Sequence, residues 1–388
     1  MPYLDNAATT PLEPRVLEKM MPYLTGVFGN PSSIHRFGQE AKKAIETAHR
    51  EVASFVGAEP REVIFTSGGT EADNMALWGI ARANAPTGGH LILSAIEHHA
   101  VLHTGEEMAR AGYAVDVVKP GPDGRLRAED VAALIRPDTF LISVMWANNE
   151  TGAVQPVAEL AALARERGLL FHSDAVQAAG HLPVRMDEVP VSSIALAAHK
   201  LSGPKGTGAL VIRSGVKISP LIVGGAHERG RRAGTENVAG IVGFAEACRL
   251  WRIEGQARQA RLDALGDRLA GGLSAISGAR RHGPGEGGMR HIVNVGFDGV
   301  DGETLLLNLD LMGVAASSGS ACTSGSLDPS HVLLAMGLSR EEAQGAVRFS
   351  LGIQNTEEDV DEAVRATAAS VERMRSLLPS PGREVRSS

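Results

Sequence analysis

A lysine that directly follows an apolar run has the clearest chemical potential in this chain. Lys200 comes after His199 and the apolar run Ile194–Ala197, and it precedes the glycine-rich segment Ser202–Gly208. A lysine at the end of a buried strand can lose its solvation, which lowers the pKa of its ammonium group and leaves an amine able to form a Schiff base. An isolated lysine in a turn is more often an exposed, solvated side chain. The histidine and the glycines beside Lys200 favour the reactive alternative.

Two further segments suit a ligand that carries a phosphate and a ring nitrogen. Gly69 and Thr70 stand where the predicted strand Glu62–Phe65 passes into a predicted helix, and the start of a helix offers free backbone N–H groups to a phosphate. Asp174 follows another apolar run, at the sheet edge where open α/β proteins bind ligands. From position alone, Thr70 and Asp174 could equally be ordinary helix-capping residues.

A phosphate-binding turn, a carboxylate for a protonated pyridine nitrogen and a nucleophilic lysine are the three parts that a pyridoxal phosphate site requires. In their order and residue identity, these segments resemble the class V aminotransferase family, and specifically the cysteine desulfurases of the NifS/IscS group. The resemblance extends from residue 3 to about residue 355. It includes five further motifs: Tyr3–Thr10, Gly29–Ser33, Asn148–Gly152, His227–Thr235 and Ser317–Ser324.

The resemblance implies an enzyme that binds pyridoxal 5'-phosphate through Lys200, whose amine would later act as acid and base on the substrate carbons. Asp174 would keep the pyridine nitrogen protonated and so make the ring a better electron sink. Gln177 would hydrogen-bond the ring hydroxyl. His98 would stack on the ring face and shuttle protons.

The resemblance also implies how the phosphate and the substrate are bound. Donors at one end of the site would hold the phosphate: Gly69, Thr70 and His199. Thr235 would reach the phosphate bound by a neighbouring subunit, which implies a homodimer. Arg348 would bind the substrate α-carboxylate, a bidentate task suited to a guanidinium, and Asn149 would lie near the ring and that carboxylate.

The chain has two cysteines, and their surroundings differ. Apolar neighbours flank Cys248, as expected for a buried structural thiol, whereas small, polar and glycine-rich neighbours flank Cys322. That composition predicts a mobile loop, and by itself it leaves a nucleophilic thiol and an inert loop thiol equally open for Cys322. The resemblance implies that Cys322 is the catalytic nucleophile.

The implied reaction takes sulfur from L-cysteine, releases L-alanine and leaves a persulfide on Cys322. The sulfur would then pass to an acceptor protein for iron–sulfur cluster assembly, or for thiolation of a cofactor or tRNA. A selenocysteine lyase or another class V lyase or aminotransferase is the alternative. A non-catalytic relative is disfavoured because the cofactor positions are all present.

One position departs from the family pattern. Ala197 stands three residues before Lys200, where family members usually carry serine or threonine. One hydrogen bond to the phosphate would be missing, at a net cost of about 0.5–1.5 kcal/mol. We therefore expect weaker retention of the cofactor rather than loss of the site. The C-terminal segment Pro379–Ser388 also differs from the tail that docks an iron–sulfur scaffold in some relatives, so it gives no support for such docking.

The elements that must position these residues form an α/β pattern. Short apolar runs alternate with helical stretches from about residue 39 to residue 212, as in a mainly parallel sheet covered by helices. Two helical stretches are expected at about 236–254 and 256–276, then a strand near His291–Gly296 and a helix at Glu357–Leu377.

The fold class is therefore α/β, and the resemblance implies fold type I of the pyridoxal phosphate-dependent transferases. We expect a large cofactor-binding domain over residues 15–255, with a mainly parallel seven-stranded sheet. Residues 1–14 and 256–378 would form a smaller α+β domain, and residues 379–388 a flexible tail.

Composition limits the remaining possibilities. The 388 residues carry a net charge of −7, so the chain has no electrostatic footprint for nucleic acid. No apolar run approaches 18 residues, which argues against a membrane span, and the first residues do not resemble a secretory signal. Two cysteines exclude a disulfide framework, argue against a metal site of the structural zinc type and favour the cytoplasm.

Overall fold

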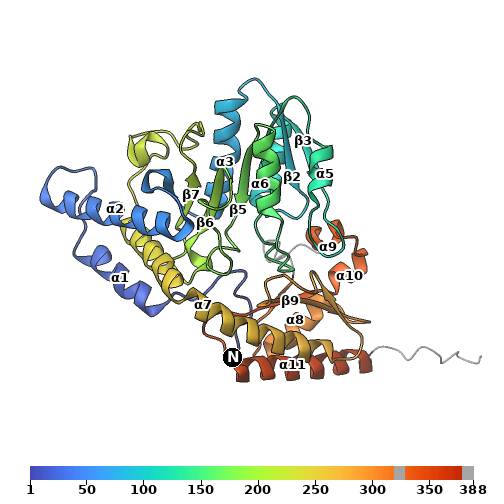
Figure 1. Cartoon of the computed structure of the whole chain (residues 1–388). Coiled ribbons are helices and arrows are strands. Elements are labelled where there is room, and N and C mark those ends of the chain that lie inside the picture. Colours follow the sequence, from blue (N-terminus) through green and yellow to red (C-terminus); the bar gives the residue numbers. More distant parts are fainter. Residues whose placement is uncertain (319–327, 378–388) are drawn as a thin grey trace, which may run out of the picture.

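The computed structural model describes residues 1–318 and 328–377. Cys322 and the predicted tail 379–388 lie outside the described residues. Two sheets organise the described part, a larger one in the upper half of Figure 1 and a smaller one in the lower half. No helix in the described ranges combines the length and the hydropathy that a bilayer span requires.

The larger sheet has seven strands in the order β1-β7-β6-β5-β4-β2-β3, and β7 alone runs antiparallel to its neighbours. The predicted α/β class with a mainly parallel seven-stranded sheet is therefore confirmed. Most of its strands are buried along their whole length, which explains their unbroken apolar sequences. The strands are β1 (Val63–Thr66), β2 (His90–Ser94), β3 (Ala114–Val118), β4 (Thr139–Ser143), β5 (Leu170–Asp174), β6 (Ser193–Ala197) and β7 (Gly208–Ile212).

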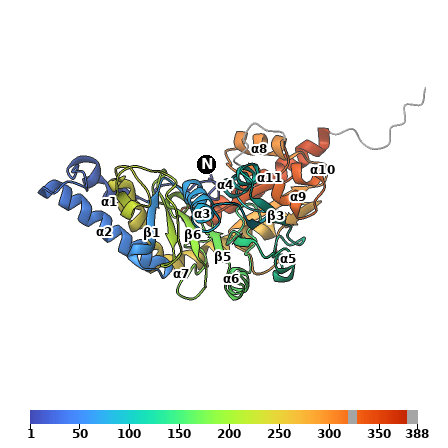
Figure 2. The same ribbon diagram turned by 90° about the horizontal axis from the view of Figure 1, so that it is seen from above.

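Helices cover both faces of this sheet, as the view from above shows (Figure 2). Successive residues of a strand point to opposite faces, so Ile64 packs into one hydrophobic cluster and Phe65 into the other. The cluster around Ile64 contains residues of α3 and α4, and the cluster around Phe65 contains residues of α2, α6 and α7. The helices are α2 (Arg36–Val56), α3 (Gly69–Asn84), α4 (His99–Arg110), α5 (Ala128–Ala133), α6 (Val157–Glu166) and α7 (Val238–Ser274).

The smaller sheet is antiparallel, with the order β10-β11-β9-β8. The N-terminal residues join it, because Tyr3 bridges to Ala315 and Asp5 bridges to Ser350. The N-terminal segment therefore lies beside the same sheet as residues from the last fifth of the chain. Its elements are β8 (Ala279–His282), β9 (Ile292–Phe297), α8 (Gly302–Leu311), β10 (Ser317–Ser318), α9 (His331–Ala335), α10 (Arg340–Gln344), β11 (Val347–Ser350) and α11 (Glu357–Leu377).

One helix connects the two sheets. The helix α7 packs against α1 (Pro14–Thr25) and α2 in its first part and against α11 later on (Figure 1). The predicted break near residue 255 is wrong, because α7 continues through Gly255. A Cβ atom there would lie 3.4 Å from Cε3 of Trp251 and 3.7 Å from the oxygen of Gly180, which are ordinary van der Waals contacts, so the packing at this position does not require a glycine. The proposed domain boundary at this residue stays a prediction.

Candidate active site

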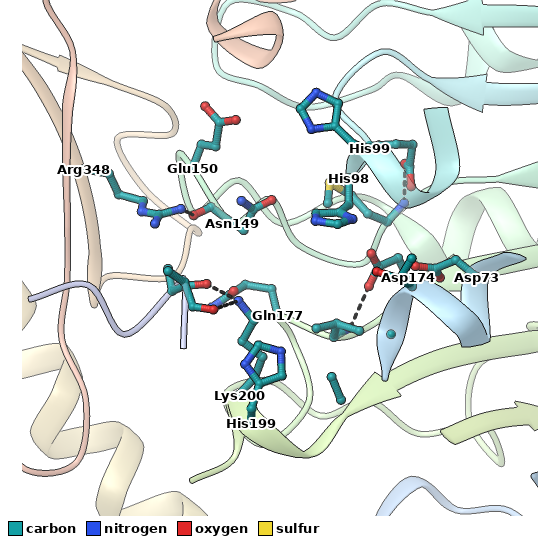
Figure 3. Close-up of a pocket in the computed structure, with 18 of the residues that line it drawn as sticks. Asp73, His98, His99, Asn149, Glu150, Asp174, Gln177, His199, Lys200 and Arg348 are labelled. Atoms are coloured by element: carbon teal, nitrogen blue, oxygen red, sulfur yellow. Dashed lines mark hydrogen bonds between the residues drawn. The ribbon is translucent and has the colours of Figure 1, made fainter. Parts of the chain in front are cut away.

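A cavity of about 310 Å³ opens beside the carboxyl ends of β4, β5 and β6. Of the predicted site residues that the structure describes, all except Thr235 line it. Those that it brings together are Gly69, Thr70, His98, Asn149, Asp174, Gln177, His199, Lys200 and Arg348. In Figure 3, Arg348 and Asn149 lie at one end of the open space, and Asp174 lies at the other.

Lys200 enters the cavity at the end of a short helical turn. The strand β6 passes directly into η2 (Ala198–Lys200), which carries the lysine beyond the sheet edge. Its Nζ donates hydrogen bonds to the backbone oxygens of Ala7 and Ala8, the latter at 2.9 Å. The N-terminal motif therefore lies directly against the lysine, although about 190 residues separate the two in sequence. This contact explains how the N-terminal segment and the middle of the chain build one site.

The neighbouring His199 is neutral at physiological pH. Burial, together with the charge of Lys200, lowers the pKa of His199 to about 4. Its Nδ1 lies 3.1 Å from Oγ1 of Thr9, which orients the ring. A neutral imidazole can donate one hydrogen bond and accept another, so His199 suits the recognition of a phosphate oxygen.

The turn between β1 and α3 brings the start of a 16-residue helix to the cavity. Gly69 and Thr70 are its first residues, and their backbone lies where unpaired N–H groups and the helix dipole favour an anion. Close packing also demands a glycine opposite this turn. A Cβ on Gly208 would lie 2.7 Å from the carbonyl carbon of Gly68, too close for any other residue.

A buried carboxylate occupies the other side of the cavity. Asp174 is the last residue of β5, and its Oδ1 accepts a hydrogen bond from the backbone N–H of Val176 at 2.9 Å. Burial raises the pKa of Asp174, against the opposing influence of His98 and Lys200. A protonated ring nitrogen would supply the positive charge that this carboxylate needs.

His98 and Gln177 offer complementary groups to a ring between them. The Nδ1 of His98 accepts a hydrogen bond from the backbone N–H of Ala100 at 3.1 Å, so a neutral ring carries its proton on Nε2. The buried Oε1 of Gln177 has no hydrogen-bond partner within the described ranges. A ring hydroxyl is a donor that this orphaned oxygen could accept. The donor set of the cavity thus fits pyridoxal phosphate.

Arg348 comes from the smaller sheet, on strand β11, and is fully buried. Its Nη1 donates to the backbone oxygen of Asn149 at 3.0 Å, and its Nη2 donates to Oδ1 of Asp5 at 2.8 Å. Its buried Nε has no partner among the residues described. A buried guanidinium with donor capacity left is suited to bind a carboxylate.

Several buried acids that the sequence analysis did not single out lie around the same cavity. Asp73 on α3 contacts Nε2 of His172 at 3.2 Å, and burial together with Asp174 raises the pKa of Asp73. Burial raises the pKa of Glu97 to about 8, although Ser94 and the backbone of residue 145 donate hydrogen bonds to it. Asp73 lies among the buried, mostly apolar residues of α3. A charged residue on the apolar face of a helix was the signal in the sequence that could have identified it.

Two predicted residues are not placed in this cavity. Thr235 is exposed and does not line it. Cys322 belongs to the segment 319–327, outside the described residues.

Comparisons with known proteins give one consistent result. The chain matches the aminotransferase class-V family over residues 2–363. It is 47% identical over 384 residues to a protein named cysteine desulfurase IscS from Methanosarcina thermophila, covering 99% of this chain and 95% of that protein. A protein of the same name from Dictyoglomus turgidum is 46% identical over 378 residues, covering 97% of this chain and 96% of that protein.

Solved structures give the same result. A NifS-like protein superposes with a TM-score of 0.90 at 38% identity, over 96% of this chain and 99% of that one. DndA from Streptomyces lividans superposes with a TM-score of 0.77 at 41% identity, over 88% of this chain and 97% of that one. The chain therefore belongs to the class V aminotransferase family, within its NifS/IscS group of cysteine desulfurases.

Proposed function

We propose that this protein is a pyridoxal phosphate-dependent cysteine desulfurase, which converts L-cysteine to L-alanine and holds the removed sulfur as a persulfide on Cys322. The observation that carries the proposal is the meeting of Lys200, Asp174 and Arg348 in one cavity, from three separate chain segments. Family membership and the curated relatives' names support the same activity.

The residues of the cavity would hold the cofactor as follows. Lys200 would attach it covalently, and Asp174 would pair with its ring nitrogen. Gln177 would accept the ring hydroxyl proton in a hydrogen bond, and His98 would cover one face of the ring. The phosphate would lie at the start of α3, bound by Gly69, Thr70 and His199. When bound, pyridoxal phosphate supplies an electron sink for negative charge on the substrate carbons.

The protein's own groups would bind and orient the substrate. Arg348 would hold the α-carboxylate of L-cysteine, assisted by Asn149, whose backbone already fixes the guanidinium. Lys200 would accept the proton from Cα and return protons to the carbon skeleton. Because the site is partly buried, these charged groups act on the substrate with little screening by water.

Cys322 would perform the sulfur transfer. Its thiolate would attack Sγ of L-cysteine, forming an S–S bond as the Cβ–Sγ bond breaks. The electron pair of the broken bond stays with the carbon skeleton, which takes up a proton and leaves as L-alanine. The chain's other thiol is unsuited to this step, because Cys248 is completely buried in α7 and burial raises its pKa well above the ordinary value.

The working form would be a cytoplasmic homodimer. Apolar side chains on and near the first two helices are exposed in the single chain, with Phe28 75% and Ile34 94% accessible, as expected of a surface that another subunit covers. Thr235 does not line the cavity of its own subunit, and it would bind the cofactor phosphate in the partner subunit. A sulfur-acceptor protein, such as an iron–sulfur scaffold or a thiolation enzyme, would receive the persulfide sulfur.

A single-turnover assay tests this function. Mixing the holoenzyme with one equivalent of L-cysteine per subunit, without added reductant, should yield one L-alanine and one protein persulfide per subunit. Cys322→Ser should keep the cofactor absorbance and form neither product, whereas the matched variant Cys248→Ala should form both. Wild-type turnover by Cys322→Ser would refute the assignment of the nucleophile, and it would favour another lyase activity of the family.

A further inference from the structure

The segment between β7 and α7 is tied to the phosphate side of the cavity. It contains η3 (His227–Gly230), in which Glu228 and Arg229 have left-handed backbones with φ of 45° and 57°. Residues other than glycine seldom adopt this conformation, and it persists only where the surroundings enforce it. The contacts of this segment show what enforces it.

The first contact is a two-point ion pair. The Nε of Arg232 donates to Oε1 of Glu71 at 2.9 Å, and its Nη2 donates to Oε2 at 3.2 Å. Glu71 stands in the first turn of α3, directly after Thr70, and its Oε2 also accepts the backbone N–H of Ser67 at 2.8 Å. One carboxylate thus joins both sides of the phosphate-binding turn and fixes them to Arg232.

The pKa of Glu71 and the burial of both side chains support a stable ion pair between Glu71 and Arg232. Burial acts to raise the pKa of Glu71, but the hydrogen bonds from Arg232 and Ser67 bring it below its ordinary value. Both side chains are mostly covered, with 22% of Arg232 and 11% of Glu71 accessible. A charged, bidentate pair with this degree of cover is stronger than an exposed one.

The second contact holds the left-handed turn itself. Oε2 of Glu228 lies 3.0 Å from Nε2 of His49 on α2, and both side chains are buried. The Nδ1 of His49 lies 2.9 Å from the backbone oxygen of Ile45. The rings of His49 and Phe65 pack in a T-shaped arrangement with centroids 4.6 Å apart, and Phe65 is the β1 residue two positions before Ser67.

We propose that Arg232 and Glu71, with His49 and Glu228 behind them, form a brace that positions the turn Ser67–Thr70 for the cofactor phosphate. These are positioning residues, since none of the four lines the cavity. The brace sets the affinity for the phosphate group of pyridoxal phosphate and leaves the ring end of the site unaffected. The inference rests on the proposed function, which places the phosphate at this turn.

Paired binding measurements test the brace. Dissociation constants of pyridoxal phosphate and of pyridoxal, which lacks the phosphate, are measured for the apoprotein of the wild type and of Arg232→Gln, Glu71→Gln and the double variant. Each single variant should bind pyridoxal phosphate about tenfold more weakly, equivalent to about 1.4 kcal/mol, with unchanged affinity for pyridoxal. The double variant should lose no more than either single variant, because the two residues act as a pair.

Two further variants separate positioning from general damage. Arg232→Lys keeps the charge but not the bidentate geometry, and it should restore part of the affinity. Glu228→Ala should give the same phosphate-selective loss, because it releases the left-handed turn. The matched control Arg249→Gln removes an ion pair with Glu246 on α7, away from the cavity, and should change neither constant.

The outcomes distinguish this proposal from the proposed function. Equal losses for pyridoxal phosphate and pyridoxal would overturn the brace and indicate a general effect on folding. If the variants bind pyridoxal phosphate as tightly as the wild type does, and the wild type turns over L-cysteine, the brace alone would be overturned. A wild type that binds no pyridoxal phosphate would overturn the proposed function together with the brace.

Discussion

The Nη1 of Arg348 donates a hydrogen bond of 3.0 Å to the backbone oxygen of Asn149, which lies 199 residues earlier in the chain. Arg348 belongs to the smaller sheet, and Asn149 belongs to the loop after β4 of the larger sheet. The same guanidinium donates to Asp5 in the N-terminal segment. This end of the cavity is therefore assembled from three parts of the chain.

Arg348→Lys should lower kcat/KM for L-cysteine by about 10- to 100-fold, mainly through a higher KM. Lysine keeps the charge but cannot make the bidentate contact, which is equivalent to losing about 1.5–3 kcal/mol of charge-assisted hydrogen bonding. Steady-state kinetics measures the change. Arg280→Lys, on the exposed strand β8 of the same sheet, is the matched control and should behave as wild type. An unchanged KM in Arg348→Lys would show that the carboxylate binds elsewhere.

Asp174→Asn should lower kcat at least about 100-fold while pyridoxal phosphate remains bound, because the neutral amide no longer stabilises a protonated ring nitrogen. Asp73→Asn is a matched control within the same cavity. Burial and the proximity of Asp174 raise the pKa of Asp73, which favours its uncharged form, so the amide should change the charge of the cavity less here than at Asp174. Turnover rates and cofactor absorbance measure both variants. Equal losses would contradict a special role for the charge on Asp174.

Ala197→Ser should tighten the binding of pyridoxal phosphate by between about 2- and 10-fold, the value of one added hydrogen bond. Ala197 lines the cavity, and its Cβ lies 3.8 Å from the position that a Cβ on Gly69 would occupy. An added hydroxyl would thus border the phosphate-binding turn. Fluorescence titration of the apoprotein gives the dissociation constant. Ala197→Gly adds no hydroxyl and should not bind more tightly; tighter binding by both would point to a change in packing.

The raised pKa of Glu97 predicts that the stability of the protein depends on pH. Burial raises its pKa to about 8, far above the value in an unfolded chain, so the folded state binds a proton that the unfolded state has lost. The stability contribution of Glu97 is therefore fully present below about pH 4.5 and is lost as the pH rises to about 8. Relative to Glu97→Gln, the wild type should become steadily less stable from about pH 5 to pH 8 and then change no further.

Urea unfolding of the holoenzyme across this range measures the difference. Glu107→Gln replaces an exposed glutamate on α4, and its stability relative to wild type should not vary in this way with pH. A constant difference between wild type and Glu97→Gln from pH 5 to pH 8 would show that Glu97 is ionised in the folded protein.

The sequence by itself determined the local elements and the side chains at their ends. The apolar run Ile194–Ala197 predicted a buried strand, and β6 spans Ser193–Ala197; the helix predicted at Glu357–Leu377 coincides with α11. Lys200 and Asp174 could be placed together because parallel strands end at one sheet edge. Periodicity and burial are properties of short segments, so a sequence displays them directly.

Only the tertiary structure decided which distant residues meet. It joined Asn149 to Arg348 and Glu71 to Arg232, and it surrounded the cavity with buried carboxyls such as that of Glu97. It also carried α7 through Gly255, between the two helical stretches that the sequence analysis had predicted separately. A contact between residues far apart leaves no periodic signal, and the burial that shifts a pKa depends on neighbours from other segments. These features arise only when the chain is packed.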